Sequence, residues 1–272
     1  MLFKSFQAGI DKIKQIDSEF QLDAIEIVLQ TRYPDTPREQ RISPEFLLDL
    51  GCFFVPDEDY LEAIFGPEST NPVYNFYNYD GTCKWVQNLM IPIRDVDGSL
   101  VGFTGFNPTS KLIKEDNLNL PPEEQLEVPF KYNDSDRRVF NKTNFMLVPL
   151  GYKKMLEDDY VFVTDGVFDA LFIAYLGFNS AANLGTSVSD ATVFTLSLVD
   201  KVITLEDNDS AGKCLHRTLR KYLGRVGSIR QGSCKDIDQF LSEHDPSKFK
   251  ATLNEAIANP RGTISCISRF SR

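Results

Sequence analysis

Residues 160–175 read YVFVTDGVFDALFIAY, and residues 202–212 read VITLEDNDSAG. In each stretch an apolar, β-rich run stops abruptly at acidic residues: Asp165 follows the first run, and Asp207 and Asp209 stand in the second. Such runs predict buried strands, and the stretches after them, the first one amphipathic, predict helices. Strands that alternate with helical segments of about ten to fifteen residues indicate βαβ units on a parallel sheet, whose functional crevice lies at the carboxyl ends of the strands. The acids therefore fall at the functional edge.

A third acidic run, with Asp236 and Asp238, follows a short strand that is expected near residues 228–230. Two unit charges about 4 Å apart repel by roughly 4 kcal/mol at an effective dielectric of about 20, so converging carboxylates keep a proton or bind a cation. A ligand set made only of oxygen atoms favours Mg²⁺, with Mn²⁺ as the second choice. Any one of these acids is as well explained by a turn or a helix cap. Three clusters in one α/β unit favour a metal site.

The acid-Gly turn after the first strand, Gly185-Thr186, the Asp-x-Asp-x-Ala-Gly run and the Lys-Asp-x-Asp run occur in this order. This arrangement resembles the toprim domain of bacterial-type primases, topoisomerases and some nucleases. The resemblance implies a catalytic role for Asp165, Asp207 and Asp209. It also implies metal ligation by all five acids, which are Asp165, Asp207, Asp209, Asp236 and Asp238. Primases of this type usually have Glu where this chain has Asp165.

Two segments upstream carry a further resemblance. Residues 90–106 read MIPIRDVDGSLVGFTGF and predict two short strands joined at an Asp-Gly turn, and residues 129–145 read PFKYNDSDRRVFNKTNF. In this order they resemble the segments ahead of the toprim domain in DnaG-like primases. The resemblance implies that Lys131 and Lys142 contact the nucleotide or template, with Arg137 and Arg138 as weaker candidates. Taken alone, these cations are equally typical of a solvated face. Asp134 and Asn107 depart from the family pattern, which has Asn at the first position and often Arg at the second.

The expected fold is α/β: a toprim-type parallel sheet with flanking helices, preceded by a mixed α+β basic lobe. We divide the chain into a mainly helical lead-in (1–85), a basic lobe (86–153), a toprim domain (154–245) and a C-terminal helix and tail (246–272). An amphipathic helix is predicted over residues 16–30, with Ile16, Phe20, Ile25, Val28 and Leu29 facing inward. A polar loop is predicted over residues 110–127.

The net charge of −10 over 272 residues argues against a protein that coats duplex DNA, so nucleic-acid binding should be weak and local. Residues 210–234 contain no acid, and their helical part predicts a basic stripe opposite Leu215, Leu219 and Leu223. This stripe is either a solvent face or a guide for a nucleic-acid strand or an acidic partner. The five cysteines include no Cys-x-x-Cys pair, so neither zinc nor a disulfide is expected. No signal peptide or membrane span is predicted, which favours the cytoplasm.

The resemblance implies metal-dependent synthesis of short RNA primers on single-stranded DNA, from nucleoside triphosphates, during DNA replication. The sequence lacks the usual zinc ribbon and helicase-binding domain, which favours a phage-encoded enzyme acting in the host cytoplasm. It also predicts help from a replicative helicase or a separate zinc-ribbon protein that acts in initiation. Two alternatives stay open. One is a toprim nuclease that cleaves phosphodiesters, and the other is a catalytically degenerate replication scaffold or inhibitor, suggested by Asp165, Asn107 and Asp134.

Overall fold

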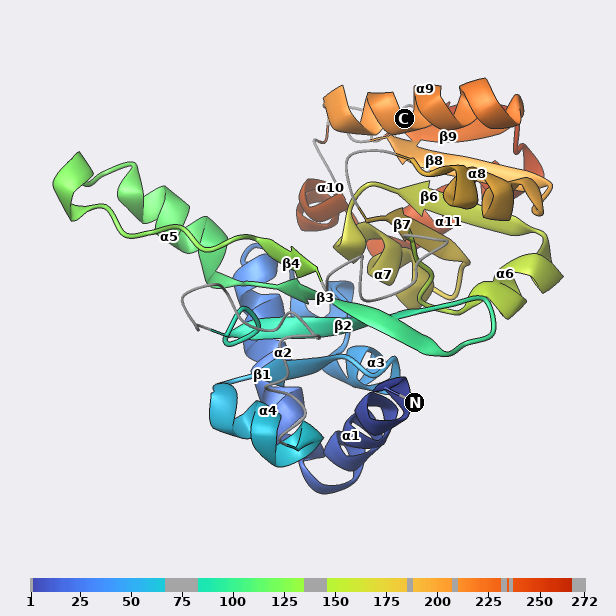
Figure 1. The fold of residues 1–272 in the computed structure, drawn as a ribbon. Helices are drawn as coiled ribbons and strands as arrows, with labels where there is room; N and C mark the ends of the chain where they lie inside the picture. Colours follow the sequence, from blue (N-terminus) through green and yellow to red (C-terminus); the bar gives the residue numbers. More distant parts are fainter. Residues whose placement is uncertain are drawn as a thin grey trace. The chain divides into compact units, whose positions relative to one another are not determined.

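The computed structural model describes residues 2–66, 83–134, 146–184, 188–206, 210–230, 234 and 237–265. Within these ranges, the side chains of residues 2–5, 133–134 and 210–212 are not described. The chain forms two compact units. Unit 1 comprises residues 1–34, 43–93 and 99–142, and unit 2 comprises residues 35–42, 94–98 and 143–272. Figure 1 shows the helices and strands of each unit along the chain.

Unit 1 is built on a four-stranded sheet of order β1-β2-β3-β4, with β1 (Phe53–Val55), β2 (Asn88–Arg94), β3 (Leu100–Phe106) and β4 (Tyr132–Asp134). The pairs β1–β2 and β3–β4 are antiparallel. Gly98 adopts a positive φ of 82° in the turn between β2 and β3, where its N–H donates to the carbonyl of Asp95 over 2.9 Å. Glycine tolerates this conformation at no steric cost, so the predicted turn at Asp97-Gly98 is confirmed.

Four helices of unit 1 precede β2: α1 (Leu2–Ile16), α2 (Ser18–Arg32), α3 (Pro44–Asp49) and α4 (Glu58–Phe65). Rings from α1, α4, β1, β3 and the segment before β2 pack together in its core: Phe6, Phe53, Phe65, Trp85 and Phe103 are all buried. Phe103 makes edge contacts with Phe6, Phe53 and Trp85. Such aromatic packing buries the apolar face of a small sheet.

The helix predicted over residues 16–30 is confirmed as α2, which starts two residues later, but two of its five predicted inward residues are wrong. The chain leaves helical geometry at Asp17, whose carboxylate accepts a hydrogen bond from the Tyr60 hydroxyl over 2.7 Å. Ile16 and Phe20 are therefore exposed (66% and 41%), whereas Ile25, Val28 and Leu29 are buried as predicted. Gln21 takes the inward position, where its side-chain amide pairs with both the N–H and the carbonyl of Phe54.

The loop predicted over residues 110–127 is wrong in its first part, which is helical. Residues Thr109–Asn117 form helix α5, and a 3₁₀ turn, η4, covers Pro122–Glu124. The side chain of Asn107 accepts hydrogen bonds from the backbone N–H and the hydroxyl of Thr109, which satisfies a donor at the start of α5. The Asn107 departure therefore has a local structural role.

Unit 2 contains a six-stranded sheet of order β10-β9-β8-β6-β7-β5. Its strands are β5 (Met146–Leu147), β6 (Tyr160–Thr164), β7 (Ser180–Asn183), β8 (Lys201–Glu206), β9 (Val226–Arg230) and β10 (Thr263–Ser265). The pairs β10–β9, β9–β8, β8–β6 and β6–β7 are parallel, and β5 joins antiparallel at one edge. The strands predicted at 160–164, 202–205 and near 228–230 are confirmed, as is the α/β class.

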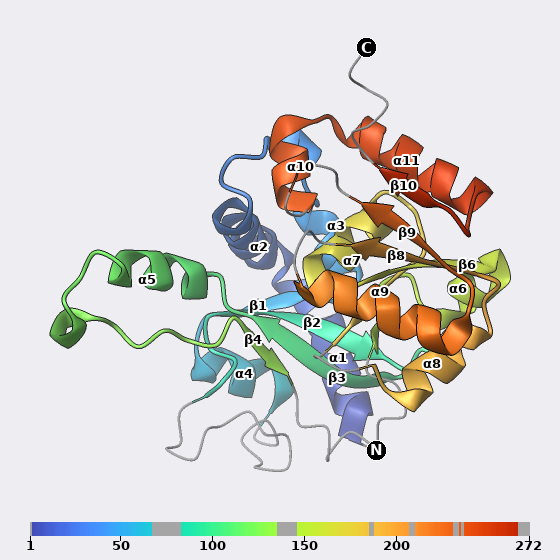
Figure 2. The same cartoon turned by 90° about the horizontal axis from the view of Figure 1, so that it is seen from above.

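Helices cover both faces of this sheet (Figure 2). On one face α6 (Tyr152–Asp158), α8 (Asp190–Ser197) and α9 (Ser210–Leu223) share a buried cluster with valines of β6, β8 and β9. On the other face lie α7 (Val167–Tyr175), α10 (Ile237–Glu243) and α11 (Pro246–Ala258), where Phe172, Phe240 and Phe249 stack. The stretch that forms α7 was expected to be amphipathic, but residues 167–174 are all buried. None of the helices that the structure describes is long and apolar enough to cross a bilayer.

Candidate functional site

The carboxyl ends of β6 and β8 meet at one edge of the unit 2 sheet. The two strands are adjacent and parallel, with Val163 opposite Thr204. Asp165 is the residue directly after β6 and is partly exposed, and Glu206 is the last residue of β8. The structure therefore places Asp165 at the edge that the sequence predicted, beside the strand that leads into Asp207.

A second carboxylate, that of Asp169, lies against the turn after β6. Asp169 is only 6% exposed and belongs to the first turn of α7, where the positive end of the helix dipole favours an anion. A Cβ atom added at Gly166 would lie 2.3 Å from its Oδ2, so only glycine leaves room for this carboxylate. The sequence analysis missed Asp169. Its signal was an acid in the first turn of an otherwise apolar helix.

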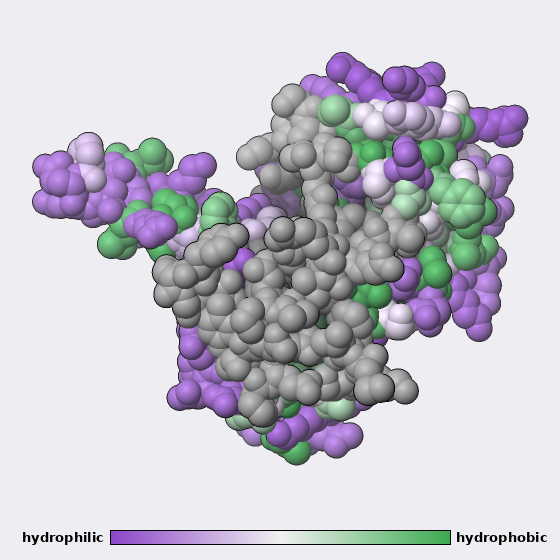
Figure 3. Space-filling view, in the orientation of Figure 1, coloured by the Kyte–Doolittle hydropathy of each residue, from purple (hydrophilic) through white to green (hydrophobic). Residues whose placement is uncertain are grey.

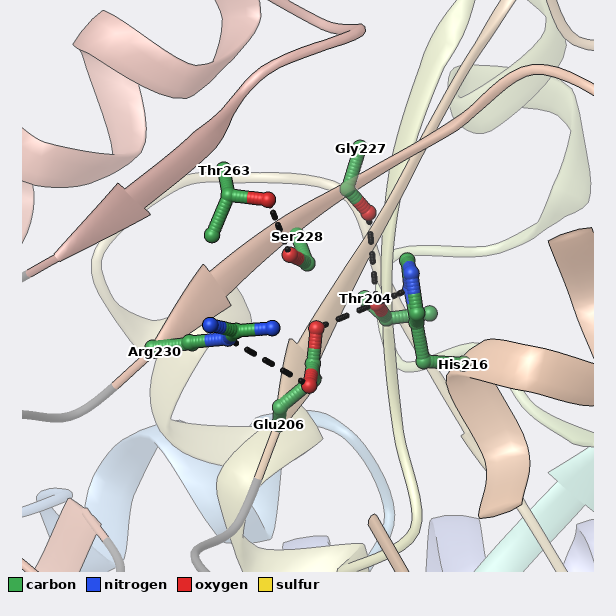
Figure 4. Close-up of polar contacts among 7 residues, drawn as sticks. All are labelled: Thr204, Glu206, His216, Gly227, Ser228, Arg230 and Thr263. Atoms are coloured by element: carbon green, nitrogen blue, oxygen red, sulfur yellow. Dashed lines mark hydrogen bonds and ion pairs between the residues drawn. The ribbon is translucent and has the colours of Figure 1, made fainter. Parts of the chain in front are cut away.

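Glu206 lies in a polar cluster between β8, β9 and α9 (Figure 4). Its side chain is 6% exposed, with Oε2 3.7 Å from Nε of Arg230 and Oε1 3.7 Å from Nδ1 of His216. Arg230 is its cross-strand neighbour on β9. Among the described residues Oε1 accepts no hydrogen bond. Sequence reasoning missed this cluster, because its members are far apart in the chain.

His216 contacts Thr204 in this cluster. Its Nδ1 atom lies 2.7 Å from Thr204 Oγ1, where either atom can be the donor. The Thr204 hydroxyl also lies 3.2 Å from the Gly227 carbonyl, which can only accept. Burial lowers the pKa of His216 below its ordinary value of 6.5, an effect that Arg220 and Arg230 reinforce and Glu206 opposes. The imidazole is consequently neutral at pH 7.

The remaining predicted residues are placed only in part. Asp238 stands in the first turn of α10 and is partly buried. Lys131 precedes β4 and is exposed, with its ammonium 5.3 Å from the centre of the Tyr132 ring. The Lys131 carbonyl accepts the N–H of Asn107 over 3.0 Å, which fixes its backbone. The other predicted residues lie outside the described residues, and these are Asp207, Asp209, Asp236, Lys142, Arg137 and Arg138.

One further group of potential metal ligands occurs in the part of unit 2 that the structure describes. Ligand atoms of Cys234, Glu243 and His244 lie within 4.8 Å of one another. Cys234 is buried, but Glu243 is exposed, and its Oε1 atom accepts a hydrogen bond from the Gln239 side chain. This mixed set differs from the oxygen-only set that the sequence predicts for magnesium.

The amino-acid sequence is similar to those of bacterial DNA primases. The DNA primase of Synechococcus elongatus is 25% identical over 183 residues, which cover 62% of this chain and 24% of that protein. The DNA primase of Aquifex aeolicus is 26% identical over 179 residues, which cover 63% of this chain and 33% of that protein. The chain thus spans about a quarter to a third of the length of these relatives. No protein-family model matches it.

The fold is similar to solved primase structures. The DnaG catalytic core gives a TM-score of 0.63 at 18% identity and covers 94% of this chain and 80% of that one. The Aquifex aeolicus primase, with zinc-binding and RNA polymerase domains, gives 0.62 at 19% identity, covering 89% and 62% of the two chains. The DnaG catalytic domain bound to single-stranded DNA gives 0.59 at 20% identity, covering 93% and 82%. The chain therefore has the fold of the DnaG-type primase catalytic core, as the sequence motifs predicted.

Proposed function

We propose that this chain is the catalytic core of a DNA primase, which joins nucleotides into short RNA primers on single-stranded DNA during replication. The observation that carries this proposal is the shared carboxyl edge of β6 and β8, with Asp165, the buried Asp169 and Glu206, the residue before Asp207 in the sequence, in a fold similar to the DnaG core. The DnaG catalytic domain bound to single-stranded DNA supports the choice of template.

The residues at this edge fit a hard divalent cation. Asp169 is a buried carboxylate that lies against Gly166, the residue after the partly exposed Asp165, and acids gathered at one turn are stabilised when a cation compensates their charge. We assign Asp165, Asp169, Asp207 and Asp209 as the residues that would hold Mg²⁺ or Mn²⁺, with Asp236 and Asp238 as further support. The ion would neutralise the triphosphate and lower the pKa of the attacking hydroxyl.

The chain's own residues would position these groups. Gly166 lets the Asp169 carboxylate lie against the backbone, and Arg230 supplies a positive charge beside Glu206 at the end of β8, directly before Asp207. Lys131 offers an exposed ammonium on a fixed backbone, which suits contact with phosphate. Lys142, Arg137 and Arg138 are proposed to extend this contact. A replicative helicase or a separate zinc-ribbon protein would assist initiation.

The Asp207→Ala substitution tests the proposal. It should lower dinucleotide formation from labelled nucleoside triphosphates by at least about 100-fold, because it removes charge stabilisation in the transition state. The assay uses purified protein, Mg²⁺ or Mn²⁺ and random single-stranded DNA, and circular dichroism checks that the variant stays folded. The matched control is Asp190→Ala, which removes an exposed acid from α8 in the same unit. Synthesis retained by the Asp207 variant would exclude the metal assignment.

The same assay separates the two alternative functions. Shortened fragments of labelled DNA, without new oligomers, would support a toprim nuclease. Neither product, together with no change in unfolding temperature on adding Mg²⁺, would support a catalytically degenerate scaffold. New oligomers that disappear in the Asp207 variant would support the primase.

A further inference from the structure

Unit 2 contains a pocket at the amino end of β8, which is the end of this strand farthest from Asp207. It has a volume of about 460 Å³, which is within the range of small-ligand pockets. Helices α8 and α9 are in contact and supply four of its ten lining residues, and the segments just after α8 and α9 supply most of the others. The lining residues are Asp159, Leu196, Ser197, Leu198, Val199, Asp200, Val202, Tyr222, Leu223 and Arg225. No proposed catalytic residue is among them.

Five of the ten residues that line this pocket are aliphatic, the others are polar, charged or aromatic, and its rim carries exposed apolar side chains. Leu196, Val199 and Val202 are buried and belong to or adjoin the unit 2 core. At the surface Leu198 is 54% and Tyr222 57% exposed, and Phe194, one turn before Leu198, is 66% exposed. Large apolar side chains that gather in this way mark an interaction site more often than scattered ones do.

A stripe of cations runs along α9 toward this pocket. Lys213, Arg217 and Lys221 succeed one another at intervals of four residues, so each lies about 6 Å further along the helix, and all are exposed. Arg220 adds a fourth cation, and Arg225 follows at the rim of the pocket. Hydrophilic residues cover α9 in Figure 3, and hydrophobic residues lie below them on the same face. This stripe contrasts with the net charge of −10 of the whole chain.

We propose that the α8–α9 pocket docks an acidic peptide segment of a partner protein. One apolar side chain of the peptide fills the pocket between Leu198 and Tyr222, and its carboxylates lie along the cationic stripe. Charge complementarity selects an anionic partner. The exposed apolar side chains Phe194 and Leu198 favour a peptide, whose own apolar side chains can cover them, over a nucleic-acid strand, whose affinity rests mainly on its phosphates.

Fluorescence anisotropy with three labelled probes tests this proposal. The probes are a short peptide rich in Asp and Glu with one Phe, the same peptide with Ser in place of Phe, and oligo(dT). The Phe peptide should bind the full chain best, and added salt should weaken it. Leu198→Ser and Tyr222→Ser should each weaken it about tenfold, because both remove an apolar wall without changing the charge.

Charge variants complete the test. Lys221→Glu and Arg225→Glu should weaken binding of the Phe peptide, whereas Lys250→Glu, an exposed lysine of α11 in the same unit, should not. Primer synthesis by Leu198→Ser should equal that of the unchanged chain, which separates this proposal from the proposed function. Equal binding of the Phe and Ser peptides would overturn the proposal that an apolar side chain fills the pocket. Tighter binding of oligo(dT) that the same variants weaken would overturn the peptide as occupant.

Discussion

Glu206 and His216 are ion-pair neighbours by distance, yet the structure keeps the imidazole neutral. The Nδ1 atom of His216 is hydrogen-bonded to the Thr204 hydroxyl, and burial disfavours the protonated, charged imidazole by lowering its pKa. Arg230 therefore supplies the positive charge next to Glu206. The cluster joins β8, β9 and α9 through contacts that depend on one uncharged histidine.

The stability of the protein should fall in mild acid because of His216. Its folded pKa is lower than its unfolded value of 6.5, so the unfolded chain takes up this proton first as the pH falls. The contribution of His216 to the free energy of unfolding is fully present above the unfolded pKa and is lost as the pH falls below it. The urea midpoint should accordingly decrease between about pH 7.5 and pH 5.5. His216→Asn, which keeps a donor for Thr204, should reduce this decrease.

His244→Asn is the matched control, since His244 is the chain's other histidine. The prediction fails if both variants change the pH dependence equally.

At the level of single residues, the sequence identifies acids only where a strand visibly ends. Asp165 was found for this reason, and Asp207 and Asp209 stay predictions. Asp169 and Glu206 were missed because their importance comes from burial and from partners on other elements, such as Arg230 on β9. The role of Lys131 rests on the family motif alone and stays a prediction.

Among the elements, the turn between β6 and α7 has the tightest steric requirement. Gly166→Ala should destabilise the protein by about 1–3 kcal/mol, because the new methyl group overlaps the Asp169 carboxylate. It should also reduce the rise in unfolding temperature on adding Mg²⁺. Both are measured by thermal unfolding.

A double variant separates the two effects. Asp169→Ala in the Gly166→Ala background removes the overlapping carboxylate, so stability should recover in part while the response to Mg²⁺ stays low. If Gly166→Ala alone leaves both stability and response unchanged, the Asp169 placement is wrong.

Local patterns predict the elements whose cause is local. The strands of unit 2 follow from their β-branched runs, and the β2–β3 turn follows from Asp97-Gly98. The break at Asp17 does not, because it depends on Tyr60, 43 residues away. Helix α5 was missed because its sequence is polar and resembles a loop. Contacts seen only in the structure support it: Asn107 accepts the N–H of Thr109, and Lys111 lies 3.6 Å from Glu115.

For the whole molecule, Mg²⁺ should stabilise the folded state. A ligand that binds only the folded chain adds about 2.7 kcal/mol at 100 times its Kd. The unfolding temperature should therefore rise with Mg²⁺ and rise less in the Asp207→Ala variant. Because the net charge is −10, NaCl at matched ionic strength is the control for general screening. Equal rises in both salts would contradict a specific site.

The architecture as a whole was predictable because alternating strands and helices permit few arrangements, and the order of the acidic motifs narrowed them further. The division into four segments stays a prediction. The α8–α9 pocket was beyond sequence reasoning, since it is formed by residues from Asp159 to Arg225 that only the folded sheet brings together.

The central position of β8 and β6 affects the order in which the strands of the unit 2 sheet unfold locally. Both strands have hydrogen-bonded neighbours on each side, whereas β5 and β10 end the sheet. Backbone amides in the middle of a sheet exchange with solvent water only through large-scale opening, while terminal strands fray cheaply. The acidic residues after β6 and β8 thus follow the strands of the unit that unfold last, so fraying of β5 or β10 leaves the carboxyl ends of β6 and β8 folded.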